Sequence, residues 1–125
     1  MSQILVIDDD PQILQLIEAL LDYEGHSVLI ARDGREGLAL LSGDVDLVVT
    51  DLLMPNKEGL ETIADIRRGG WGVPVIAITA GGAMGPRNYL ATAQLVGANA
   101  ALAKPFTQDE LLATVRSLLE VSVAC

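Results

Sequence analysis

The sequence predicts a single doubly wound α/β domain, in which a parallel sheet carries helices on both faces. Short apolar runs of strand length alternate with helical patterns along the whole chain, without a linker, an internal repeat or a low-complexity segment. The 125 residues fit one domain, and half of them are apolar, which is enough for one good core. Strict alternation of strands and helices favours parallel pairing through right-handed crossovers.

Five short apolar runs are predicted to form the strands of this sheet. The first has the length and the β-branched content of a buried strand, and the fourth carries Pro74 near its start. All five are too short to be helices of ordinary length. The expected strands cover residues 4–7, 27–31, 46–50, 73–78 and 100–103.

Five helices are predicted to follow the strands. The first begins at Pro11, a residue suited to the first helical turn, and stops at Gly25. Its apolar residues recur on one face, as expected for a helix that packs against a sheet. The other helices are expected over residues 34–41, 58–68, 87–96 and 108–121, with a flexible glycine-rich loop before the fourth of the five.

Composition and charge exclude several classes of protein. A net charge of −9 argues against a nucleic-acid surface and against binding to anionic membranes. The single cysteine, Cys125, leaves no disulfide framework and favours a reducing compartment. No signal peptide and no apolar stretch of membrane-spanning length is apparent, so we expect a cytoplasmic protein.

Carboxylates follow two of the predicted strands at the point where each strand ends. Asp8 and Asp9 come directly after the first strand, and Asp51 follows the third. Ligands of open α/β sheets bind beyond the carboxyl ends of the strands, where the strand order reverses. If the first and third strands are neighbours, these three side chains converge into one acidic pocket.

Such a pocket needs a counter-charge, because carboxylates with ordinary pKa values near 4 are all ionised at neutral pH. Oxygen ligands in a small cluster suit Mg²⁺, and Lys104 and Thr79, at the ends of two further strands, add an ammonium and a hydroxyl. This set of groups can neutralise and accept a phosphoryl group. Each feature alone has an ordinary structural explanation, such as a helix cap at Asp10, but four strand ends together favour phosphoryl chemistry.

Four segments carry a resemblance to a known family: "ILVIDDDP", "DLVVTDLLMPNKEGLE", "VPVIAITA" and "GANAALAKPF". In this order and spacing, the sequence resembles the receiver domain of two-component response regulators over residues 1–125. The resemblance implies a flavodoxin-like sheet with strand order 2-1-3-4-5. It also implies that Asp51 accepts a phosphoryl group from a sensor histidine kinase or a phosphotransfer protein, and that a protein-interaction surface then switches.

The resemblance assigns roles to individual residues. Asp9 and Asp51 would bind Mg²⁺ directly, Asp8 mainly through water, and the backbone carbonyl of Leu53 would be a further ligand. The family acts by self-phosphorylation and slow self-dephosphorylation, so we do not expect an enzyme with other substrates. Its output would be a downstream protein or an attached output domain, with no nucleic acid bound by this domain.

Further roles follow from the same resemblance. Thr79 and Lys104 would contact the phosphoryl oxygens, Gly59 would serve the turn into the third helix, and Pro105 would follow a cis peptide bond. The family usually has an aromatic residue where this chain has Ala101. We therefore expect the signal to pass through backbone rearrangement of residues 81–86 and of the start of the helix that follows, instead of through rotation of a ring.

Rival functions fit the sequence less well. A phosphatase of the haloacid dehalogenase type needs Asp-x-Asp-x-Thr or Val after the first strand, and here Asp8 and Asp10 are followed by Gln12 with no cap domain. An interaction module without phosphorylation chemistry would generally lack the acceptor aspartate or the lysine. A nucleotide-binding protein would need a glycine-rich motif after the first strand, which is missing.

Overall fold

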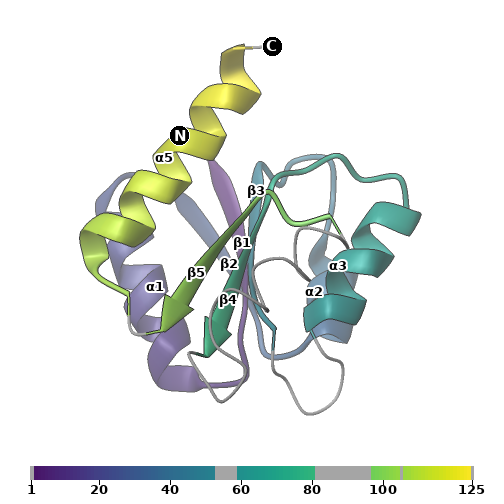
Figure 1. Cartoon of the computed structure of the whole chain (residues 1–125), viewed down its shortest axis with the longest axis horizontal. Coiled ribbons are helices and arrows are strands. Elements are labelled where there is room, and N and C mark those ends of the chain that lie inside the picture. The colour runs from purple at the N-terminus through teal and green to yellow at the C-terminus, as the bar shows by residue number, and fades with distance from the viewer. Residues whose placement is uncertain (1, 53–58, 81–96, 105, 125) are drawn as a thin grey trace.

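The computed structural model describes residues 2–52, 59–80, 97–104 and 106–124 (Figure 1). Five strands form one parallel sheet in the order β2-β1-β3-β4-β5, which confirms both the doubly wound topology and the strand order that the resemblance implied. The strands are β1 (Gln3–Ile7), β2 (Ser27–Ala31), β3 (Leu47–Asp51), β4 (Val75–Ala80) and β5 (Ala100–Lys104).

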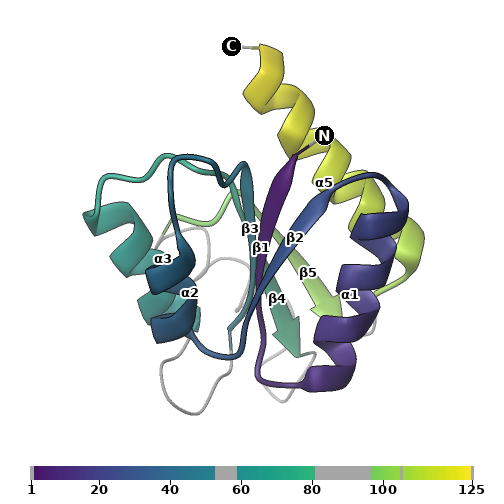
Figure 2. The ribbon, with the colours of Figure 1, turned by 180° about the vertical axis from the view of Figure 1, so that it is seen from behind.

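Helices cover both faces of the sheet. The described helices are α1 (Pro11–Tyr23), α2 (Gly34–Leu40), α3 (Gly59–Arg68) and α5 (Gln108–Ala124). Figures 1 and 2 show α1 and α5 together on one face and α2 and α3 on the other. The helix expected over residues 87–96 lies outside the described residues, and four of the five expected helices are confirmed.

Alternate residues of the central strands contribute to two apolar layers, one on each face of the sheet. Ile4 and Val6 of β1 pack in the layer under α1 and α5, together with Ile17 of α1. Leu5 and Ile7 pack in the opposite layer, under α2 and α3. Because side chains of a strand point alternately to opposite faces, a continuous apolar run is what a central strand between two helical layers requires.

Local signals fix where α1 begins and ends. The Asp10 carboxylate accepts a hydrogen bond from the backbone N–H of Gln12 at 2.9 Å, and Pro11 occupies the first helical turn, which confirms the predicted cap. Gly25 adopts a φ of 91°, which favours glycine, and ends the helix. The Asp10 side chain is therefore used to cap the helix. Asp8 and Asp9 are the two acidic residues after β1 whose carboxylates are left for a site at the sheet edge.

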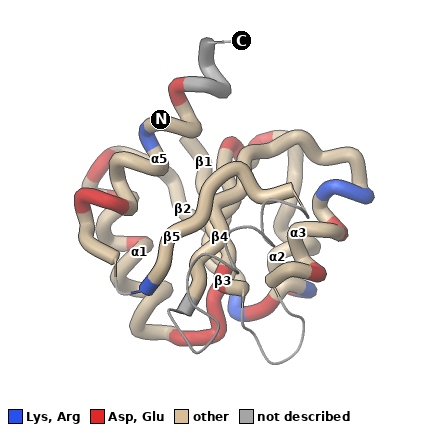
Figure 3. The backbone as a smooth tube through the Cα atoms, in the orientation of Figure 1, with Lys and Arg blue, Asp and Glu red and all other residues tan. Residues whose placement is uncertain are grey.

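Acidic positions outnumber basic ones and are spread over several helices as well as the end of β3 (Figure 3). Among the helices that the structure describes, none is both long enough and apolar enough to cross a membrane.

Candidate functional site

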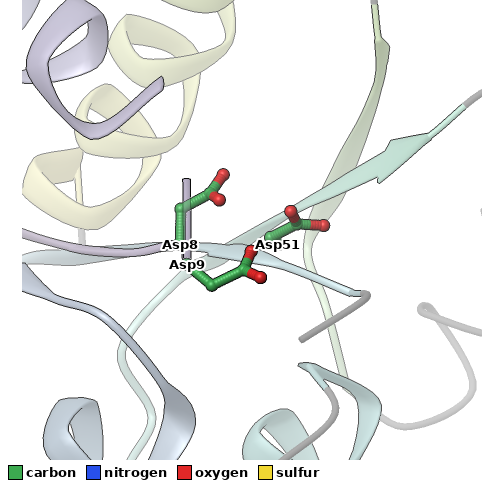
Figure 4. Close-up of side chains that lie close together, drawn as sticks. All are labelled: Asp8, Asp9 and Asp51. Carbon is green, nitrogen blue, oxygen red and sulfur yellow. The ribbon is translucent and has the colours of Figure 1, made fainter. Parts of the chain in front are cut away.

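Three carboxylates meet at the carboxyl ends of β1 and β3. The two strands are parallel neighbours with Ile7 opposite Thr50, so the residues that follow Ile7 lie beside Asp51. One carboxylate oxygen from each of Asp8, Asp9 and Asp51 lies within 4.8 Å of the other two (Figure 4). Asp8 and Asp51 are buried, whereas Asp9 is exposed to solvent. The predicted acidic pocket is therefore present.

Lys104, the last residue of β5, reaches this pocket across the end of β4. Its ammonium donates a hydrogen bond to Asp51 Oδ2 at 3.1 Å, and its Nζ lies 3.7 Å from Asp8 Oδ2. One cation thus bridges two of the three carboxylates. It offsets part of their repulsion and leaves the cluster with net negative charge.

Thr79 lies in β4 at the same edge of the sheet. Asp51 pairs with Ile78 across β3 and β4, so Thr79 stands one residue beyond the level of the Asp51 backbone. The side chain is buried, and its hydroxyl donates to the Leu102 carbonyl at 3.5 Å, which is long for a hydrogen bond. Little interaction energy therefore holds this hydroxyl in its present orientation.

Burial dominates the electrostatics of the pocket. It raises the pKa of the Asp8 carboxyl from 3.8 to about 6, and repulsion from Asp51 and Asp9 acts in the same direction. The backbone N–H of Asp10, which donates to Asp8 Oδ1 at 2.9 Å, and the ammonium of Lys104 oppose the shift. Burial lowers the pKa of Lys104, but attraction to Asp51 and Asp8 outweighs it, so the net shift is upward.

The donor set suits a hard divalent cation. Asp8 Oδ2 is a buried oxygen that accepts no hydrogen bond within the described part of the chain. Buried polar atoms normally have such a partner, and a metal ion is one way to supply it. Carboxylate oxygens without sulfur or imidazole ligands are typical of Mg²⁺ and Ca²⁺ sites. The residues present therefore fit a divalent cation on chemical grounds.

Gly59 explains how α3 can begin directly against this pocket. A Cβ atom at this position would lie 2.0 Å from the Asp51 carbonyl oxygen and 2.5 Å from Leu52 Cα. The backbone N–H of Gly59 donates to the Leu52 carbonyl at 3.0 Å. Only a residue without a side chain allows this approach, and Gly59 thereby fixes the backbone that carries Asp51.

Several predicted features lie outside the described residues: the Leu53 carbonyl, the bond before Pro105 and the 81–86 loop. They stay predictions. Ala101 is described, and its methyl group packs against the apolar layer on the α2 and α3 face.

One residue at this edge was not singled out from the sequence. Arg32 directly follows β2, and it lines a pocket of about 160 Å³ together with Asp9, Pro11 and Leu14. The rule that identified Asp8 and Lys104, a charged residue directly after a strand, applies equally to Arg32. That rule, applied to the end of the second strand as well, would have found it.

The comparisons with known proteins agree with this geometry. The response regulator receiver domain family matches residues 4–116. This chain belongs to that family. It is therefore a receiver domain of the two-component response regulators, as the four sequence segments indicated.

Relatives and solved structures support the same assignment. The chain is 41% identical over 122 residues to the transcriptional regulatory protein CpxR of Klebsiella pneumoniae, covering 98% of this chain and 51% of that protein. It is 40% identical over 118 residues to the response regulator MprA of Mycolicibacterium vanbaalenii, covering 94% and 50%. The chain thus spans about half the length of these curated relatives.

A receiver domain protein from Clostridium thermocellum superposes with a TM-score of 0.90 at 31% identity, covering 99% of this chain and 98% of that one. The receiver domain of the Francisella response regulator 1452 gives a TM-score of 0.89 at 30% identity, covering 98% and 99%. Both likenesses extend over nearly the whole length of each chain.

Proposed function

We propose that Asp51 accepts a phosphoryl group from the phosphohistidine of a sensor histidine kinase or a phosphotransfer protein, in a Mg²⁺-dependent reaction. The resulting acyl phosphate would switch a protein-interaction surface. The observation that carries the proposal is the convergence of Asp8, Asp9 and Asp51 with Lys104 at one edge of the sheet. Membership of the receiver family supports it.

The proposed metal ligands are the carboxylates of Asp9 and Asp51, with Asp8 acting mainly through water and the Leu53 carbonyl as a further ligand. When bound, Mg²⁺ would neutralise phosphoryl oxygens and lower the repulsion between the donor and the carboxylates. The unpartnered oxygen of Asp8 and the exposure of Asp9 support this arrangement, since the first could accept a hydrogen bond from a metal-bound water and the second leaves an open path for the ion.

In the transfer step, a carboxylate oxygen of Asp51 attacks phosphorus while the phosphorus–nitrogen bond to the donor imidazole breaks. The bonding electron pair leaves with the imidazole nitrogen, and the product is an aspartyl phosphate. Lys104 would exchange its contact with Asp51 Oδ2 for a phosphoryl oxygen. The Thr79 hydroxyl would donate to another phosphoryl oxygen. Breaking its present hydrogen bond would cost little free energy, because that bond is long.

The wider role of the chain follows from its relatives. CpxR is named a transcriptional regulatory protein, and this chain covers about half of it. We place the chain in the cytoplasm, passing its signal to a downstream protein or to an attached output domain. Its net charge of −9 is unsuited to nucleic acid, so DNA contact would fall to another part of such a regulator.

Incubation with acetyl phosphate and Mg²⁺, followed by intact mass measurement, tests the proposal. We expect one added phosphoryl group, and none in Asp51→Asn, because the near-isosteric amide lacks a nucleophilic oxygen. Asp44→Asn, an exposed aspartate outside the pocket, is the matched control and should be phosphorylated like wild type. Phosphate on serine or threonine, or repeated hydrolysis of phosphomonoesters, would contradict the acceptor role.

A further inference from the structure

A small pocket adjoins the carboxylate cluster on the side of β2. Asp8 donates its backbone N–H to the Ala31 carbonyl at 3.1 Å, which holds the residues after β1 beside those after β2. The pocket has a volume of about 160 Å³ and is lined by Asp9, Pro11, Leu14 and Arg32. The pocket therefore combines two apolar side chains, one carboxylate of the cluster and a guanidinium group.

The guanidinium of Arg32 differs from the other cation of the site. Lys104 is held by Asp51 and Asp8, whereas no ion pair or hydrogen bond to a described residue engages Arg32, which is exposed. The neighbouring Asp33 uses its carboxylate to cap α2, accepting the Glu36 N–H at 2.8 Å. Arg32 is thus a positive charge that can interact with a ligand at the rim of a negatively charged site.

A charge in this position has two opposite effects. It repels a divalent cation that binds at Asp9, and it attracts the anionic donor that must approach the same cluster. We propose that Arg32 is a specificity-determining residue, which contacts the anionic phosphoryl donor in this pocket and weakens Mg²⁺ binding at Asp9. Pro11 and Leu14 would contact the non-transferred part of the donor. The inference rests on the proposed function and deepens it.

The metal effect is tested with Mg²⁺ alone. We expect Arg32→Ala to bind Mg²⁺ about threefold more tightly at low ionic strength, which is the effect of one charge on a divalent ion across roughly 10 Å of water. Arg32→Lys should stay close to wild type, since it keeps the charge. Arg35→Ala, which removes an exposed arginine of α2 that does not line the pocket, is the matched control. Mg²⁺ titrations monitored by nuclear magnetic resonance measure the affinities. The difference in affinity between Arg32→Ala and wild type should nearly vanish in concentrated salt.

The donor effect is tested by phosphorylation rates at saturating Mg²⁺. For Arg32→Ala we expect about a threefold loss of second-order rate constant with dianionic acetyl phosphate, and roughly a 1.7-fold loss with phosphoramidate, which carries about one charge at neutral pH. Arg32→Lys should restore both rates, a result that a merely structural role would not produce.

The outcomes separate the two claims. If the wild-type chain takes no phosphoryl group, the proposed function fails. If Arg32→Ala leaves Mg²⁺ affinity unchanged, or changes it no more than Arg35→Ala does, the role of Arg32 at the metal is overturned. Tighter Mg²⁺ binding with unchanged donor rates would overturn the donor contact.

Discussion

Asp8 illustrates how a single residue sets the electrostatics of the site. It is buried, it lies beside two further carboxylates, and its pKa is raised to about 6, chiefly by burial. The folded chain therefore holds an ionised group that would be better solvated in the unfolded chain. Such a cost is expected where a charged ligand supplies the compensating interaction.

Replacing Asp8 with asparagine should therefore stabilise the metal-free protein at alkaline pH. Above pH 6 the Asp8 carboxyl is ionised in both the folded and the unfolded chain. The folded chain then bears the full free-energy cost of burying the ionised group. As pH falls from 6 towards 3.8, the folded state takes up a proton that the unfolded state does not, so the cost disappears. We expect a gain of up to about 3 kcal/mol in unfolding free energy at pH 8, from about two pKa units, and almost none at pH 3.5.

Denaturant unfolding in a chelating buffer at the two pH values measures this difference. Asp44→Asn, at an exposed site, should show no comparable gain. A variant Asp8→Asn that is less stable than wild type at pH 8 would show that Asp8 favours folding even without metal.

Gly59 is a second residue whose role depends on one close approach. Substitution by alanine would place a Cβ 2.0 Å from the Asp51 carbonyl oxygen, so β3 and α3 must separate. We expect a loss of about 2–4 kcal/mol in unfolding free energy, and slower phosphorylation because the backbone of Asp51 moves. Gly43→Ala is the control, since a Cβ added at Gly43 would meet nothing within 4 Å. Equal stability of the two variants in denaturant unfolding would disprove the steric argument.

At the level of elements, one arginine joins three segments at the end of the sheet opposite the site. The Arg67 guanidinium, at the end of α3, donates to the carbonyls of Gly97, Trp71 and Val73 and to Asn99 Oδ1, at 2.7–3.0 Å. It thereby ties the end of α3 and the link to β4 to the residues that precede β5. The far end of the sheet is therefore connected by contacts that do not involve the carboxylate pocket.

Arg67→Lys should destabilise the fold strongly although it preserves the charge. An ammonium cannot replace the forked set of donors, and each partly buried carbonyl that loses its hydrogen bond, such as that of Val73 or Gly97, costs about 1 kcal/mol. We expect a loss of about 1–3 kcal/mol in denaturant unfolding. Arg68→Lys, where the guanidinium is exposed and pairs only with Asp65 among described residues, should change stability by less than about 0.5 kcal/mol. Similar losses in both variants would contradict the view of Arg67 as a specific connection.

For the whole molecule, the strand-end rule accounts for what could be predicted. Parallel strands place the residues that follow them at one edge, so the alternation of strands and helices predicts that Asp8, Asp51, Thr79 and Lys104 share one edge of the sheet. The strand order needed the family resemblance, because alternation does not say which strands are neighbours.

Other features could not be predicted, because they depend on distances between segments far apart in the chain. The close approach of Gly59 to the Asp51 carbonyl needs the exact position of α3, and the contacts of Arg67 need the backbone path near Gly97. The pocket beside Arg32 depends on how α1 packs against the end of β2. Sequence periodicity specifies which face of an element is buried, but it does not specify these separations.

The central claim is that Asp51 receives the phosphoryl group while Lys104 changes its contact. A crystal structure of the chain with Mg²⁺ and beryllofluoride, a phosphoryl mimic, tests it most directly. We predict beryllium bonded to Asp51, a metal about 2.1 Å from oxygens of Asp9 and Asp51, and Lys104 Nζ moved from Asp51 Oδ2 to a fluoride. Beryllofluoride on another carboxylate, or Lys104 still bound to the Asp51 carboxylate beside a bound mimic, would contradict the account.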